Sequence, residues 1–173
     1  MREPRRPILD GTEELGVEWR TAWRLRDPAI EADAKALWER LSLLPTGVDL
    51  DQRAEELVCA AYVEGEIAAA ATAFVREIDF LRARFAMFRC AVDPKFRAHS
   101  IARKIAGVSK DILQTWAFET TEDEVLGMAT VVQSADIQAK SRSAIWRTSG
   151  LVLVGYTDMG EQIRVAWFDH ARV

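Results

Sequence analysis

The sequence has few cysteines and no long apolar run, and each shortage excludes a class of protein. Its only cysteines, Cys59 and Cys90, both lie within apolar stretches. This number supports neither a disulfide framework nor a zinc site, so we expect two buried free thiols and no bound metal. No apolar run follows Met1, and no other segment approaches the length of a membrane span. We therefore expect a soluble, cytoplasmic protein without a membrane partner.

An excess of positive charge is also missing. The chain has 23 Lys and Arg against 27 Asp and Glu, a formal net charge of -4, so we do not expect nucleic acid as a partner. We find no internal repeat and no low-complexity linker, and an apolar content of 49% indicates one domain over residues 17–173. Residues 1–16 mix Pro, Gly and charge without periodicity, which predicts an extended or poorly ordered arm.

Hydrophobic periodicity predicts the element order β, α, α, β, β, β, α, β, α, β, β. Strands are expected over 17–25, on both sides of a turn at Glu64-Gly65, and over 84–92, 125–133, 151–156 and 163–170. Helices are expected from Asp27-Pro28 to Leu43, after a cap at Asp49, over about 18 residues from Ser100, and from Asp136 to Ser149-Gly150. This order indicates a mixed α/β or α+β sandwich whose sheet is antiparallel in its hairpins.

The run Ala68–Ala71 lies in one of these predicted strands, although alanine usually favours helix. We predict a strand because Ile67, Phe74 and Val75 supply the bulk that strands prefer. Small side chains would let a helix or a cofactor lie close to this strand.

The stretch "AVDPKFRAHSIARKI", residues 91–105, joins a strand end to a helix through a basic turn. Successive N–H groups at such a turn can form a nest for phosphate oxygens. Arg97, Arg103 and Lys104 add positive charge, and the small residues at 98, 100 and 102 would let an anion approach the main chain. The alternative is a helix capped by Ser100 with solvated basic residues around it.

This stretch resembles motif A of the Gcn5-related N-acetyltransferase (GNAT) superfamily. The matching positions are Val92, Pro94, Phe96, Arg97, Ala98, Ser100, Ala102 and Ile105, with alanine and serine in place of two motif glycines. A second block, "AIWRTSGL" at residues 144–151, resembles the segment that ends the last helix of that family. The element order is similar as well, over roughly residues 17–170.

The resemblance implies a mixed, mostly antiparallel sheet of about seven strands flanked by about four helices. It also implies that acetyl-CoA, or another acyl-CoA, lies where strands 84–92 and 125–133 splay apart. Pantetheine contacts would fall on Cys90, Ala91 and Val92, and pyrophosphate contacts on Arg97, Ala98, His99, Ser100, Ile101 and Ala102, with Arg103 beside them. Trp146 stands where the family often has a tyrosine acid, and it could pack against pantetheine instead.

Acyl transfer to an amine needs a base, because an ammonium must first lose its proton. No carboxylate lies on strand 84–92, so our first candidates are Glu77 and Asp79, followed by His170 and by Tyr156 as a proton donor. The alternatives are an exposed strand end for the two carboxylates, a surface histidine, and a core or rim tyrosine. Arg76, Arg82, Arg84 and Arg89 form a basic arm, either for an acidic acceptor or the adenosine phosphate, or as a solvated edge.

The sequence thus predicts an acyl-CoA-dependent N-acyltransferase, most simply an acetyltransferase acting in a ternary complex on an unidentified amine. One alternative is a binding module that keeps the fold without catalysis. Another is an enzyme that takes longer acyl chains from CoA or acyl carrier protein, which the alanine-rich strand could accommodate. A homodimer through the C-terminal strands is also expected, because "IRVAWFDH" would offer an apolar edge.

Overall fold

The computed structural model describes residues 16–120 and 124–172, without the side chains of residues 97–99 and 140. The predicted arm over residues 1–16 therefore lies, apart from Gly16, outside the described residues. No helix in the described part of the chain is long and apolar enough to cross a membrane.

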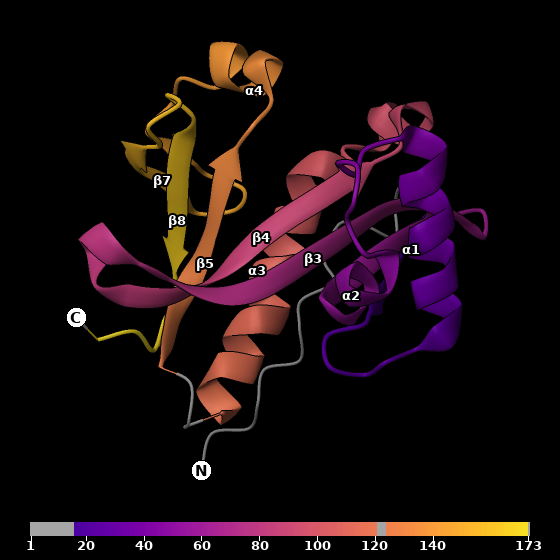
Figure 1. The fold of residues 1–173 in the computed structure, drawn as a ribbon, viewed down its shortest axis with the longest axis horizontal. Coiled ribbons are helices and arrows are strands. Elements are labelled where there is room, and N and C mark those ends of the chain that lie inside the picture. The colour runs from indigo at the N-terminus through magenta and orange to yellow at the C-terminus, as the bar shows by residue number, and fades with distance from the viewer. Residues whose placement is uncertain (1–15, 121–123, 173) are drawn as a thin grey trace.

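One mixed sheet of eight strands, in the order β1-β2-β3-β4-β5-β8-β7-β6, organises the described residues (Figure 1). The strands are β1 (Val17–Thr21), β2 (Leu57–Val63), β3 (Glu66–Ile78), β4 (Ala83–Val92), β5 (Val125–Val132), β6 (Ile145–Trp146), β7 (Leu151–Tyr156) and β8 (Gln162–Trp167). The β4–β5 pair is parallel and the other neighbouring pairs are antiparallel. The predicted α+β class is confirmed, with one strand more than expected.

Helices cover the two faces of this sheet unequally. They are α1 (Pro28–Leu41), α2 (Leu50–Glu55), α3 (Ile101–Glu119) and α4 (Ala135–Lys140). The apolar stripe of α3, including Ile105 and Leu113, packs on one face with Phe88. On the other face α1 and α2 pack over the first strands, where Leu37 of α1 shares a cluster with Tyr62. Figure 1 shows α1 and α2 over one side of the sheet and α3 behind it.

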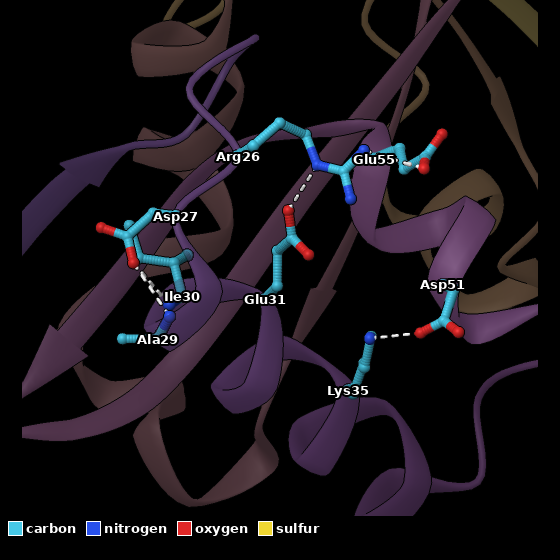
Figure 2. Close-up of polar contacts among 8 residues, drawn as sticks. All are labelled: Arg26, Asp27, Ala29, Ile30, Glu31, Lys35, Asp51 and Glu55. Carbon is cyan, nitrogen blue, oxygen red and sulfur yellow. Dashed lines mark hydrogen bonds and ion pairs between the residues drawn. The ribbon is translucent and has the colours of Figure 1, made fainter.

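Both predicted helix caps of the N-terminal region are confirmed. Asp27 accepts hydrogen bonds from the N–H groups of Ala29 and Ile30 (Figure 2). Asp49 caps α2 in the same way. Figure 2 also shows how the two helices are joined: Arg26 donates to Glu31 of α1 and Glu55 of α2, each at 2.8 Å, and Lys35 pairs with Asp51. These contacts hold α2 against the start of α1.

Several other predicted features are confirmed. Gly65 has φ +79° in the turn between β2 and β3. The alanine run lies within β3, and its members are buried under helices of both faces.

The predicted first strand is too long, because β1 ends at Thr21 and the chain then turns.

The predicted last helix, from Asp136 to Ser149, is wrong. Helix α4 ends at Lys140, its cap is Ser134, and β6 follows. The physical reason is the buried guanidinium of Arg164, which donates to the carbonyl groups of Ser141, Ser143 and Ala144. A helix would require these carbonyls for its own hydrogen bonds.

The predicted apolar edge at "IRVAWFDH" is also wrong. Strand β8 lies between β5 and β7 and pairs with both, so its main chain offers no open edge. The argument for a dimer through this strand is thereby removed.

Candidate functional site

The sheet opens between β4 and β5. These parallel strands pair from Arg84↔Val125 to Met87↔Ala129, and the pairing stops there although both strands continue. On its other side, β4 stays paired with β3 as far as Val92. Figure 1 shows β4 and β5 diverging beyond their shared segment. The result is a length of β4 whose β5-facing main chain has lost its strand partner.

Strand geometry identifies the main-chain groups that face this opening. The N–H of Asp93 donates to Ala68 of β3, and direction alternates along a strand, so the N–H and C=O groups of Ala91 also face β3. Those of Cys90 and Val92 face the opposite way, toward the β5 side. Of the three residues predicted to bind pantetheine, these two therefore offer main-chain donors and acceptors to the opening.

The two cysteines differ in exposure. Cys59 is buried, as predicted, and burial raises the pKa of its thiol to about 12. Cys90 is exposed, so the prediction of two buried thiols is wrong for it. A residue in the middle of an eight-stranded sheet reaches solvent here because β5 has turned away.

The turn after β4 is anchored by Asp93. Its buried carboxylate accepts from the N–H of Lys95 at 2.9 Å and from Nη2 of Arg40 at 2.6 Å. The N–H of Lys95 and the charge of Arg40 hold the pKa of Asp93 below its ordinary value. This ties α1 to the short 3₁₀ segment Pro94–His99, which carries the backbone of residues 97–99 toward α3. The anchor fixes the direction in which the chain leaves the opening.

Ser100, between the 3₁₀ segment and α3, has a left-handed backbone with φ +53°. Ser100 is the N-cap residue of α3, as the alternative predicted, but its side chain makes no capping hydrogen bond. Ile101 is buried, whereas Ala102 and Arg103 are exposed in the first turn of α3. A left-handed residue where motif A has glycine is the backbone feature that a close anion approach requires.

Three of the four predicted catalytic candidates lie away from the opening. Glu77 is exposed opposite Arg84, about 20 Å along β4 from Cys90, and Asp79 is exposed in the following turn. His170 lies against Phe118 at 5.8 Å between ring centroids, near the far end of the 19-residue helix α3. The structure therefore does not bring Glu77 or His170 together with Cys90.

Tyr156 lies at the splayed end of the sheet. It pairs with Gln162 of β8, which pairs with Val132 at the end of β5, so two strand spacings, about 10 Å, separate Tyr156 from β5. Its side chain is 61% exposed. A surface cavity of about 550 Å³ is lined by Gln138, Ala139, Arg142, Leu153, Tyr156 and Gln162.

Trp146 lies in β6 and not on a helix, half-buried against the cluster that includes α3. The Arg164 guanidinium lies 4.1 Å from the centroid of its ring, and its indole N–H is buried without a partner within the described chain. Burial lowers the pKa of Arg164, which is 0% exposed. Its Nε donates at 2.9 Å to Oε1 of Gln162, a residue that also lines the cavity.

Sequence reasoning did not identify Arg164 or Gln162, and it grouped Arg89 with exposed arginines. The signal for Arg164 was present: a lone arginine at an inward position of the apolar strand "QIRVAW" must find acceptors if the strand is buried. The partner of Arg89, Glu56, comes from a distant part of the chain.

Comparison with solved structures identifies the fold. An acetyltransferase of the GNAT family from Streptococcus pneumoniae matches with a TM-score of 0.57 and 14% identity, over 88% of this chain and 99% of its own. Salmonella typhimurium yncA, solved with its cofactor acetyl-CoA, gives 0.57 and 14%, over 91% and 97%. AtaTR bound with acetyl-CoA gives 0.59 and 8%, over 87% and 94%. No protein-family model matches the sequence, nor does any curated protein. The chain has the GNAT fold.

Proposed function

We propose that this protein, as one domain over residues 17–173, binds an acyl-CoA and transfers the acyl group, most simply acetyl, to an amine. The observation that carries the proposal is the end of β4–β5 pairing at Met87↔Ala129, which leaves the main chain of Cys90 and Val92 directed into the opening. Two proteins with the same fold hold acetyl-CoA, which supports an acyl-CoA as the ligand.

The main chain would bind the pantetheine arm as a strand binds its neighbour. Pantetheine contains two amides, and the N–H and C=O groups of Cys90 and Val92 would pair with them. The left-handed turn at Ser100 and the start of α3 would receive the pyrophosphate, with Arg97 as the cationic ligand predicted from the sequence. This arrangement would place the thioester at the inner end of the opening, next to the last β4–β5 pair.

The transfer itself is direct. The amine nitrogen attacks the thioester carbonyl carbon, the C–S bond breaks, and the CoA thiolate takes up the proton that the nitrogen releases. Among the predicted catalytic groups, Tyr156 lies at the splayed end and is our candidate for returning that proton. A thiol resembling cysteine has a pKa of about 8.5, so the thiolate leaves readily and loss of Tyr156 would slow transfer without abolishing it.

Particular observations bear on the two alternative functions, a non-catalytic binding module and an enzyme that uses longer acyl chains. A non-catalytic binding module is favoured by the position of Trp146 in β6, since no tyrosine acid stands there. A long acyl chain is disfavoured because the alanine strand is buried under helices on both faces and leaves no room along β3.

Titration calorimetry with acetyl-CoA tests the proposal, with Arg97→Glu as the variant expected to bind more weakly. Arg142→Glu is the matched control, because that exposed arginine lies beside the cavity at Tyr156 and outside the proposed CoA site. No binding by the native protein would remove the enzyme hypothesis. Binding without release of free CoA across amino acids, polyamines, aminoglycosides and peptides would favour the module.

A further inference from the structure

Arg89 lies on β4 beside the opening, on the face opposite α3. Side chains alternate along a strand. Phe88 packs in the cluster with α3, whereas Met87 and Ala91 belong to clusters on the other face. The side chain of Arg89 therefore projects from the face on which α1 and α2 lie. Since α3 covers one face at β4, a second substrate would approach the opening from the face that carries Arg89.

Arg89 belongs to a small charged cluster with unequal charge. Its Nη2 donates to the carboxylate of Glu56, and Nε of Arg53 lies 4.0 Å from the same carboxylate. The side chain of Arg89 is 38% exposed, and its guanidinium lies 4.6 Å from the centroid of the Phe74 ring. Two guanidinium groups share one carboxylate, so the cluster carries one net positive charge.

The guanidinium of Arg89 is also incompletely hydrogen-bonded. Within the described chain its Nε is buried without a partner, and its Nη1 makes no hydrogen bond. Burial and the neighbouring Arg53 lower its pKa, as expected for a cation that lacks compensating negative charge. Carboxylates are among the groups that arginine binds most strongly, and here Nη1 of Arg89 remains to donate to one.

We propose that Arg89 and Arg53 bind a carboxylate of the acyl acceptor, so that the acceptor is an amine carrying a carboxylate close to its nitrogen, such as an α-amino acid. This inference rests on the proposed function. Arg89 lies two residues, about 7 Å, along β4 from Met87, the last residue paired with β5, beside which the thioester would lie. A carboxylate at Arg89 and an amine at the thioester therefore fit within one small molecule. Arg76 and Arg82 are exposed and do not lie on β4 beside the opening.

Binding can be measured without turnover, using N-acetylglycine as a product-like carboxylate and N-acetylglycinamide as its neutral counterpart. Each is titrated into the full chain, and amide chemical shifts of residues 88–90 are followed by NMR. We expect N-acetylglycine to shift these amides and to bind about tenfold or more tightly than the amide. Equal binding of the two probes, or no binding of N-acetylglycine, would overturn the inference.

Three variants separate recognition from a structural ion pair. Arg89→Met should remove the preference for N-acetylglycine, whereas Arg76→Met, an exposed arginine on the same face of β3, should keep it. Glu56→Gln should strengthen N-acetylglycine binding, because it removes the internal competitor for Arg89. If the Arg89–Glu56 pair were purely structural, Glu56→Gln and Arg89→Met would have the same effect on N-acetylglycine binding. Circular dichroism of each variant checks that it is folded, and Arg89→Lys, which keeps the charge, should retain part of the preference.

A turnover assay distinguishes failure of this inference from failure of the proposed function. Release of CoA from acetyl-CoA is compared between amino acids and the corresponding amino acid amides. Equal rates for both classes would leave the transferase proposal standing and overturn carboxylate recognition. If acetyl-CoA does not bind at all, the transferase proposal fails, and the N-acetylglycine titration still decides whether Arg89 recognises a carboxylate.

Discussion

The two halves of the sheet differ in how continuously their strands pair. Strands β3 and β4 pair continuously from Ala69↔Val92 to Ile78↔Ala83, and helices cover both faces near the Ala69↔Val92 end. Between β4 and β5 the pairing stops at Met87↔Ala129, and the strands beyond carry a cavity and the buried cation Arg164. The first half therefore supplies a rigid wall, and the second half supplies the opening beside it.

This difference indicates that the first half of the sheet contributes most of the stability of the fold. Unpaired main-chain groups are costly when they are buried, so a protein tolerates them only where solvent or a ligand satisfies them. The exposure of Cys90 in a central strand shows that solvent reaches this point. We therefore expect core substitutions in the first half to reduce global stability, and changes in the second half to act locally.

The largest expected effect is in the first half. Leu37 of α1 is 0% exposed, so Leu37→Ala should lower the free energy of unfolding by about 2–5 kcal/mol, as cavity-forming substitutions do. Urea denaturation measures this, and Leu43→Ala is the control because Leu43 is 53% exposed. If both variants lost the same stability, the first half would not be the rigid part of the molecule.

A smaller and local effect is expected for Arg164→Met. Removing the guanidinium leaves the carbonyls of Ser141, Ser143 and Ala144 without their donor, which should cost about 2 kcal/mol. Hydrogen exchange should accelerate around residues 141–146 and remain unchanged in β2 and β3. Arg142→Met, an exposed neighbour, should change neither. Faster exchange throughout the sheet would contradict a local role.

Asp93 ties α1 to the turn after β4, and its effect should depend on pH. Its folded-state pKa is lowered, so its ionised form stabilises the fold above about pH 4, and this contribution is lost as the pH falls through the lowered pKa. Asp93→Asn should therefore reduce stability by about 1 kcal/mol at pH 7. The difference from the native protein should shrink as the pH falls through the lowered pKa of Asp93. A difference that persists in acid would mean that the anchor does not depend on charge.

The smallest effect is expected at Ser100. Its left-handed backbone is unfavourable for a residue with a Cβ, so Ser100→Gly should raise the stability by less than about 1 kcal/mol. A thermal melt checks this. Acetyl-CoA should bind the glycine variant at least as tightly, since the substitution clears the approach to the main chain. Weaker binding would show that the serine hydroxyl itself contacts the ligand.

The sequence predicted those parts of the fold that depend on local chemistry. Caps at Asp27 and Asp49, the turn at Gly65 and the stripe of α3 are each determined within a few residues, and all are found. The strand over the alanine run was predicted correctly from its bulky neighbours, because Ile67 and Phe74 outweighed alanine's preference for helix.

The errors arose where distant residues decide the structure. Helix α4 ends early because Arg164, more than twenty residues further along the chain, donates hydrogen bonds to the carbonyl groups of Ser141 and Ser143, which follow the helix. Arg89 could not be separated from the exposed arginines, because its partner Glu56 is 33 residues away. Pairing over such distances is not encoded in local periodicity. The predicted pantetheine segment was correctly assigned to a strand, but only the register with β3 shows which of its residues face the opening.

Hydrogen exchange at individual amides of β4 tests the central claim most directly. In the free protein the N–H groups of Cys90 and Val92 should exchange fast, while those of Arg89 and Ala91, which face β3, should exchange slowly. Saturating acetyl-CoA should slow exchange at Cys90 and Val92 and leave the other two unchanged. Slow exchange at Cys90 and Val92 without ligand, or no change when acetyl-CoA is added, would contradict the proposal that this strand holds a pantetheine arm.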